Sequence, residues 1–261
     1  MDRLASDQGD TLEGEELQAG EDTHADTADF VTEPVEEDPD SETLVGEPGG
    51  YRFSRRIAVL ADPTGTESSA VGALRNHLSQ QHIGIGRRSL AICSIGDEVQ
   101  RSLVSVNLAV AAAQAGLSTV LIDANMREPE LETYFQPPEV QPGLSDYLAG
   151  TLDDPAQVIR EDVLPNLSLI HAGERPADPQ ALLSSRRFED LVTGLMRSFD
   201  FTIVDCPAAR YSSDTRRLAS VLRYALLVVK RDVTYVADVK HFIEELTSDR
   251  VTIVGTFLDV D

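Results

Sequence analysis

The chain has 261 residues, 41% of them apolar, which is enough for one ordinary domain with an appendage. No window approaches the roughly 18 consecutive apolar residues that span a bilayer, and no basic segment followed by an apolar run forms a secretory signal at the N-terminus, so we expect a soluble cytoplasmic protein. The formal net charge of −23 argues against nucleic acid or an anionic membrane as a direct partner.

Residues 1–50 form a strongly acidic segment. They hold 17 carboxylates and a single base, Arg3, with only scattered large apolar residues. Such a segment cannot bury enough apolar surface to offset the entropy that it loses on ordering. We therefore expect a disordered acidic tail over residues 1–50, for which a binding segment is the alternative interpretation. The remaining 28 acids and 21 bases belong to a folded domain over residues 51–261.

From Tyr51 onward, short apolar runs alternate with segments of helical spacing. The first run, from Arg56 to Ala61, leads into the turn-forming residues 62–65, and this pattern predicts a strand. Further strands are predicted at 89–93, 119–122, 167–171, 201–204, 225–229 and 251–258. Helices are predicted at 67–81, 102–115, 183–198, 214–222 and 236–246.

Four of the predicted strands are continuous apolar runs rather than alternating ones. A parallel sheet that is covered by helices on both faces requires such runs. The two cysteines, Cys93 and Cys206, each lie in an apolar strand-like run and are expected to be buried free thiols. Strands that alternate with helices along the chain predict an α/β fold with a doubly wound, mostly parallel sheet.

Polar residues follow three of these strands. Asp123 and Asp205 each end an apolar run, and Ser94 ends another. Ligands of open α/β sheets bind just beyond the carboxyl ends of the strands. Two carboxylates on neighbouring strands, beside a strand–loop–helix junction, form a layout that holds Mg²⁺ and positions an attacking group. A single aspartate there would more simply be a helix cap or a turn former.

Several segments, taken together, resemble the cytoplasmic domain of the bacterial tyrosine autokinases, or BY-kinases. The segments that carry the resemblance are 89–115, 120–129, 142–150, 181–188 and 201–207. The similarity extends from about Ser54 to the C-terminus. It implies a P-loop NTPase-like fold of the MinD/ParA-like branch, with Walker A, A′ and B motifs. It also implies a role beside the chain-length regulators of capsule and exopolysaccharide export.

The phosphate-binding loop departs from the family pattern. Family loops read Pro-Gly-Glu-Gly-Lys-(Ser/Thr)-Thr, and counting back from residues 107–109 places Arg101 at the lysine and Ser102 at the magnesium-binding hydroxyl. Residues 97–100 read Asp-Glu-Val-Gln, so both glycines of the loop are replaced, and Gly96 stands one position too early. Glycines let backbone N–H groups approach a phosphate closely. The loop is therefore expected to have lost its phosphate cradle.

The other motifs are partly kept. Asp123 and Asp205 match family aspartates, which implies metal-binding or catalytic roles together with Ser102 if the protein is active. Asn125 replaces the second aspartate of its motif, Arg127 matches the usual arginine, and Asp259 stands near an adenine-contacting asparagine. With Gly96 and Arg101, these three residues would be vestigial nucleotide-binding positions.

Two features of family regulation are also altered. The ring-assembly helix of the family carries Glu, Arg and Arg at three-residue spacing, and these positions correspond to Ser69, Gly72 and Arg75. Only the last residue is retained. The six tyrosines are scattered, so no tyrosine-rich tail that could be autophosphorylated is apparent.

Three hypotheses remain open. The first is a non-catalytic relative, without a cofactor, that tunes polymer length or export at a membrane-anchored polysaccharide co-polymerase. It would be cytoplasmic, peripheral at the inner membrane through this partner, and able to form an oligomer. The second is an enzyme that binds and hydrolyses ATP weakly with Mg²⁺. The third is a divergent relative of the partition and cell-division-site ATPases, because one fold hosts many functions.

Overall fold

The computed structural model describes residues 43–44, 50–96, 99–209 and 212–260. The chain divides into two compact units, Met1–Pro39 and Asp40–Asp261, and the first lies outside the described residues. The expected acidic tail therefore falls almost wholly outside them. Within its range, the structure describes only Gly50 and the short strand β1 (Thr43–Leu44).

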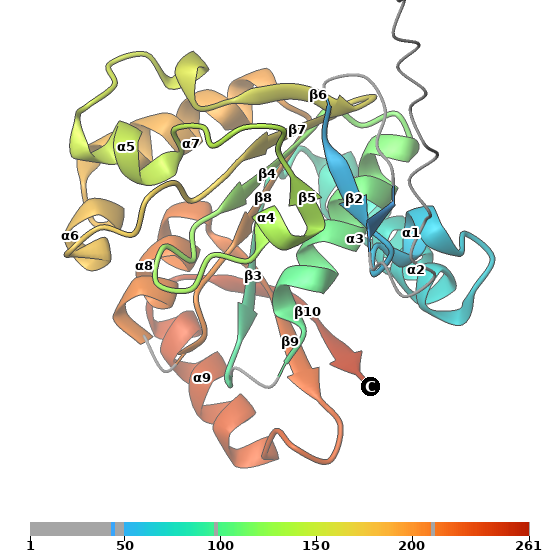
Figure 1. The fold of residues 1–261 in the computed structure, drawn as a ribbon. Coiled ribbons are helices and arrows are strands. Elements are labelled where there is room, and N and C mark those ends of the chain that lie inside the picture. The colour runs from blue at the N-terminus through green and yellow to red at the C-terminus, as the bar shows by residue number, and fades with distance from the viewer. Residues whose placement is uncertain (1–42, 45–49, 97–98, 210–211, 261) are drawn as a thin grey trace, which may run out of the picture. The chain divides into compact units, whose positions relative to one another are not determined.

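The folded unit is built on a seven-stranded sheet in the order β10-β9-β3-β8-β4-β7-β6 (Figure 1). Its strands are β3 (Ser89–Ser94), β4 (Thr119–Asp123), β6 (Arg160–Leu164), β7 (Leu167–Ile170), β8 (Phe201–Asp205), β9 (Tyr224–Lys230) and β10 (Thr252–Asp259). All neighbours pair in parallel except β6 and β7, which are antiparallel at one edge. The predicted doubly wound, mostly parallel sheet is confirmed.

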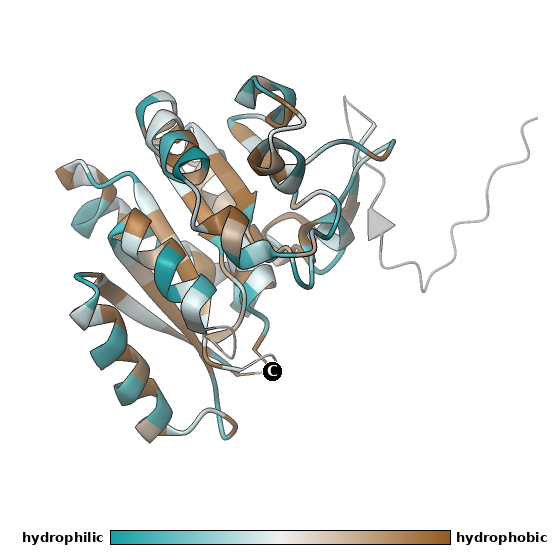
Figure 2. Ribbon diagram, turned by 90° about the vertical axis from the view of Figure 1, so that its left-hand side faces the viewer, coloured by the Kyte–Doolittle hydropathy of each residue, from teal (hydrophilic) through white to brown (hydrophobic). Residues whose placement is uncertain are grey.

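Helices cover both faces of this sheet. They are α1 (Ala58–Ala61), α2 (Thr66–Gln81), α3 (Arg101–Gln114), α4 (Leu131–Tyr134), α5 (Leu144–Ala149), α6 (Pro179–Leu183), α7 (Arg186–Ser198), α8 (Ser212–Leu222) and α9 (Val236–Ser248). One hydrophobic cluster joins the sheet to α2, α3 and α4, and a second joins it to α5, α7, α8 and α9. Figure 2 shows the hydrophobic residues gathered in the sheet and on the helix faces that meet it. Among the described residues, no helix is both long enough and apolar enough to cross a membrane.

Helix α7 illustrates how the sequence determines where a helix begins and which of its faces is buried. The Ser185 hydroxyl accepts a hydrogen bond from the Phe188 N–H and caps the first turn. Phe188, Leu191, Val192 and Leu195 are buried at positions i, i+3, i+4 and i+7. This spacing places all four on one face, which packs in the second cluster.

The segment before α2 was predicted wrongly as a strand over residues 56–61. It contains instead the one-turn helix α1, and the strand β2 (Arg52–Ser54) precedes it. Four to six apolar residues cannot be assigned to strand or helix by periodicity alone. The helix is fixed by tertiary contacts, since Val59 is buried and its N–H donates to Asn107 Oδ1 at 3.1 Å.

A small second sheet was not predicted from the sequence. It has the order β1-β2-β5, with β5 spanning Phe135–Gln136. In β2, Phe53 is buried and packs edge-on against Phe135. Tyr51, just before β2, stacks on His171 at the carboxyl end of β7. These contacts hold the N-terminal arm of the folded unit beside the carboxyl edge of the large sheet.

Candidate functional site

The strand ends named in the sequence meet at one edge of the large sheet. Asp123 of β4 is the direct register partner of Asp205 of β8. Strand β4 also pairs with β7, where Ile122 is opposite Ile170. His171, the residue after β7, therefore lies level with Asp123 at the same edge. Asp123 and Asp205 are fully buried, and His171 nearly so. The carboxyl edge therefore carries two adjacent carboxyl groups with an imidazole beside them.

Asp205 is surrounded by donors from the first turns of α3. Its Oδ1 accepts hydrogen bonds from Arg101 Nε and Ser105 Oγ, each at 2.9 Å, and its Oδ2 accepts one from Ser102 Oγ at 2.7 Å. Three protein donors thus satisfy this carboxylate directly. A buried charge that is paired and hydrogen-bonded in this way can be accommodated away from water.

Arg101 occupies the position that corresponds to the lysine of the family loop, and its side chain turns inward. The residue is only 5% exposed, and its NH1 and NH2 groups contact Ser94 Oγ and Ser102 Oγ, each at 3.3 Å. Burial alone would lower the pKa of Arg101, but the charge of Asp205 and the hydrogen bond to it raise this pKa above its usual value. The guanidinium is therefore a permanent cation at the carboxyl edge of the sheet.

Tyr134 and Arg56 lie close to this ion pair. Tyr134 is buried, and burial raises the pKa of its hydroxyl to about 12, with Asp205 among the nearby charges that contribute. Arg56 stacks over the Tyr134 ring at 5.5 Å and donates to Gln100 Oε1 at 2.8 Å. Sequence reasoning missed both residues. The signal of Arg56 was a basic side chain at the start of an apolar run, and this run was assigned to the predicted strand at 56–61.

Asp123 is held by backbone groups. Its Oδ1 accepts from the Asn125 N–H at 2.9 Å, and its Oδ2 accepts from the N–H groups of Glu130 and Leu131 at 3.2 Å. Burial and the neighbouring charge of Asp205 raise the pKa of Asp123 to about 7, although the three N–H donors oppose the shift. Asp123 consequently changes its protonation state near neutral pH.

This shift predicts a pH effect on stability. The pKa of Asp123 is higher in the folded state than the ordinary value of 3.8. Its contribution to stability is therefore fully present below about pH 4 and is lost as the pH rises through about 7. In Asp123→Asn, which cannot ionise, the loss of stability between pH 4 and 7 should be smaller by up to about 1.4 kcal/mol per pH unit. Urea unfolding of both proteins from pH 4 to 8 measures this difference, and parallel pH profiles would contradict it.

The remaining predicted site residues lie around this centre, and of their groups the Asn125 N–H bonds to Asp123 directly. Asn125 donates to the Glu128 carbonyl at 2.6 Å, and Arg127 pairs with Asp214 at 2.9 Å. The Asp259 carboxylate accepts from the Gln100 N–H at 3.2 Å. The Gly96 carbonyl accepts from Ser94 Oγ at 3.0 Å. The expected acidic replacements at positions 97 and 98 lie outside the described residues.

A magnesium ion takes carboxylate and hydroxyl oxygens that point toward it. Here the Ser102 hydroxyl donates to Asp205, and the Arg101 guanidinium lies against the same carboxylate. The described side chains around Asp205 therefore do not fit a metal ion at this position.

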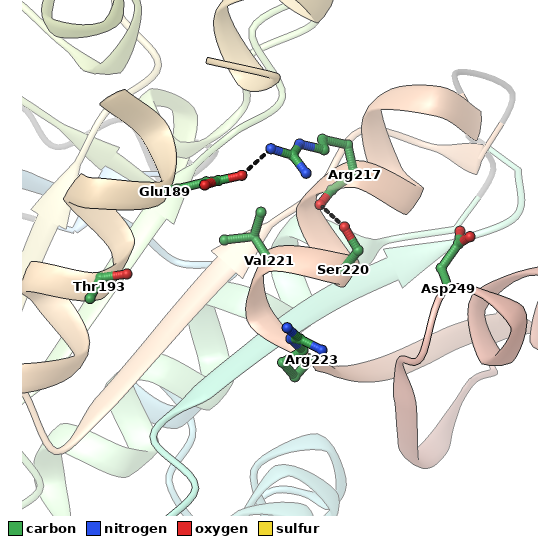
Figure 3. A pocket seen from close by; sticks show the side chains of 7 residues that line it. All are labelled: Glu189, Thr193, Arg217, Ser220, Val221, Arg223 and Asp249. Carbon is green, nitrogen blue, oxygen red and sulfur yellow. Dashed lines mark hydrogen bonds and ion pairs between the residues drawn. The ribbon is translucent and has the colours of Figure 1, made fainter. Parts of the chain in front are cut away.

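A polar cleft of about 340 Å³ lies at the opposite edge of the sheet (Figure 3). Its walls include Arg217, which pairs with Glu189, and Arg223, which directly precedes β9. Because Arg223 stands at the amino end of that strand, the cleft is remote from Asp123 and Asp205. It is not part of the candidate site.

The fold and the two strand-end aspartates beside the start of α3 define a P-loop NTPase-like α/β domain. No family model matches the sequence. Tyrosine-protein kinase CpsD of Streptococcus agalactiae is 31% identical over 187 residues, which cover 70% of this chain and 80% of CpsD. The chain belongs to the family of bacterial tyrosine-protein kinases, as the resemblance in the sequence indicated.

Solved structures agree with this assignment. The kinase domain of the Escherichia coli tyrosine kinase ETK is 26% identical with a TM-score of 0.70, and the match covers 78% of this chain and 79% of that one. The cell-division ATPase MinD of Pyrococcus furiosus has a TM-score of 0.58 at 22% identity over 66% of this chain and 71% of that one, which shows a shared fold. The match to EpsB of Ralstonia solanacearum, 30% identical, covers 79% of this chain and 27% of EpsB. The chain therefore spans about a quarter of the length of that relative.

Proposed function

We propose that this protein is a non-catalytic member of the bacterial tyrosine-kinase family that acts in capsule or exopolysaccharide synthesis. It would regulate polymer chain length or export by binding a membrane-anchored polysaccharide co-polymerase. The observation that supports the loss of catalysis is the buried ion pair between Arg101 and Asp205, at 2.9 Å. In this proposal Gly96, Asn125, Arg127 and Asp259 are remnants of a nucleotide site.

A metal ion and the Arg101 side chain would compete for the Asp205 carboxylate. A metal at Asp205 would have to displace the guanidinium of Arg101 and the Ser102 hydroxyl, both of which are almost fully buried. Displacing the guanidinium would leave a buried charge without its partner, which costs several kcal/mol. Phosphoryl transfer depends on positioned metal ions and cations, so a site that is already satisfied by its own side chains favours binding roles over chemistry.

A weak ATPase or kinase is the main alternative, because Ser102, Asp123 and Asp205 are retained. A positioning factor like the cell-division ATPases is the second, and its only support is the shared fold with MinD. Localisation in the cytoplasm, attached to the inner membrane through the co-polymerase, belongs to the first proposal. So does the division into an acidic tail over residues 1–50 and a binding domain over residues 51–261.

A titration of the full-length protein with ATP and Mg²⁺, followed by thermal melting and calorimetry, separates the first two functions. We expect no stabilisation, whereas a ligand at 100 times its dissociation constant would add about 2.7 kcal/mol. The matched variant is Asp123→Ala. Stabilisation of the natural chain that Asp123→Ala abolishes would establish nucleotide binding and overturn the non-catalytic proposal.

The partner is tested separately, by affinity capture of the full chain from membranes that contain a candidate co-polymerase. Capture of the co-polymerase without added ATP supports the proposal. Recovery of a cell-division or DNA-segregation protein instead would favour the third function.

A further inference from the structure

The polar cleft of about 340 Å³ at the amino edge of the large sheet has no part in the proposed function. It lies between α7 and α8, with the side chains of Arg217 and Arg223 on opposite sides and Ser220 and Val221 between them (Figure 3). Among the described residues that line it, Val221 alone is apolar. Its volume lies in the range of small-molecule pockets, about 300–1,000 Å³, and its polar walls favour a hydrophilic ligand.

Arg223 occupies a backbone position at which glycine is usual. Helix α8 ends at Leu222, and Arg223 follows with a φ of +70° while its N–H donates to the Ala219 carbonyl at 2.7 Å. Helices commonly end on a left-handed residue of this kind, most often glycine, because a Cβ is disfavoured there. Glycine would form the same turn with less strain, so an arginine here points to a role for its side chain.

The charges around the cleft leave the guanidinium of Arg223 without a counter-charge. Glu189 of α7 pairs with Arg217 of α8. Asp249, at the end of α9, accepts two bonds from Arg216, at 2.6 and 2.9 Å. Arg223 is exposed, and among the described residues it has no ion pair. Both acids of the cleft are thus neutralised within the chain, whereas one cation on its wall is not.

The other polar groups of the cleft retain hydrogen-bonding capacity. A guanidinium has five N–H donors, and among the described residues that of Arg217 donates only to Glu189. The Ser220 hydroxyl donates to the Arg217 carbonyl at 2.8 Å, so its oxygen can still accept a bond. Thr193 is exposed and lies one turn after Glu189 on the same face of α7. Two guanidinium groups and two hydroxyl groups therefore line one cleft.

We propose that this cleft binds the phosphate monoester of a small hydroxylated compound, such as a sugar phosphate. Guanidinium groups bind phosphate through paired N–H bonds. A phosphate monoester carries a charge of about −1.5 to −2 at neutral pH and three acceptor oxygens, so it matches two guanidinium groups better than a carboxylate does. Arg217 and Arg223 hold the phosphate from opposite sides, and the hydroxyls of Thr193 and Ser220 bond to the hydroxylated part of the ligand.

The cleft is remote from Asp123 and Asp205, which lie at the carboxyl edge of the sheet. A ligand at the amino edge therefore touches none of the groups on which nucleotide binding would depend. A chain that binds no ATP can still bind a phosphate ester here.

Calorimetric titration of the full chain with glucose-6-phosphate, glycerol-3-phosphate, inorganic phosphate and glucose tests the proposal. We expect saturable binding of at least one of the two esters, weaker binding of inorganic phosphate and none of glucose. In Arg223→Gly the affinity for the ester should fall at least about tenfold, equivalent to about 1.4 kcal/mol. This variant should melt no lower than the natural chain, because glycine fits the left-handed position. Arg223→Asn, which also tolerates that backbone conformation, replaces it if the glycine variant does not fold.

Arg250→Gly is the matched control. Arg250 is exposed and has a φ of +63° just after α9, but it is not among the described residues that line the cleft. Its glycine variant should bind the ester like the natural chain. The proposal is overturned if neither ester binds, if inorganic phosphate binds as tightly as the esters, or if Arg223→Gly leaves the affinity unchanged. An equal loss of affinity in Arg250→Gly would also overturn it.

Discussion

Asp205→Ala is expected to lower the free energy of unfolding by about 3–5 kcal/mol, because it leaves the buried guanidinium of Arg101 without its counter-charge. The same change removes the acceptor of the Ser102 and Ser105 hydroxyls. Replacing an aspartate that serves only to bind a metal ion would lower the free energy of unfolding far less when no metal is bound. Urea unfolding at neutral pH measures the difference directly.

The double variant Arg101→Met/Asp205→Ala is the control for this prediction. It removes the uncompensated cation, so it should recover part of the lost stability, and the interaction energy of the pair follows from the double-mutant cycle. A loss below about 1 kcal/mol for Asp205→Ala, the range of an ordinary surface ion pair, would show that the ion pair is not a structural element.

Gly143→Ala is expected to lower the free energy of unfolding at least as much as Asp205→Ala does. Gly143 precedes α5, and a Cβ at this position would lie inside contact distance of the Gly173 N–H group and the His171 carbonyl. Both are backbone atoms, so neither can move aside without shifting the chain. We expect a loss above about 4 kcal/mol, in the exceptional range for a point change, or a protein that does not fold.

Gly72→Ala provides the matched comparison. Gly72 lies within α2, and nothing stands within 4 Å of an added Cβ. Alanine is favoured over glycine in a helix by about 1 kcal/mol, so this variant should be slightly more stable than the natural chain. If thermal unfolding showed Gly143→Ala to be as harmless as Gly72→Ala, the close approach of residues 143 and 171–173 would be refuted.

The large sheet could be predicted because its signal is local. Runs such as 119–122 and 201–204 are apolar apart from one threonine each, and the chain returns to such a run after each helical segment. The small sheet could not be predicted in this way. Its strands have only two or three residues, and Phe53 and Phe135 are brought together by tertiary contacts across some eighty positions of the chain. Strand β6 was missed because its exposed residues Glu161 and Asp162 resemble a loop.

For the site, the sequence indicated which residues stand at the carboxyl edge but not where their side chains point. The two strand-end aspartates were evident from residue types and spacing, whereas the replaced loop glycines were inferred from the resemblance to the kinase family. The inward turn of the Arg101 side chain was not evident, because it depends on Ser94 of β3 and Asp205 of β8. His171 carried a signal that was overlooked, since it follows an apolar strand just as the aspartates do.

The pairing of Arg101 with Asp205 has a consequence for control of the protein. In proteins that cycle between nucleotide states, the positive charge near the strand-end carboxylates arrives with the metal and leaves again, and the two occupancies define two conformations. Here the charge is covalently part of the chain. Under the proposed function this charge would stay in place throughout, and no hydrolysis step would switch the domain between two conformations.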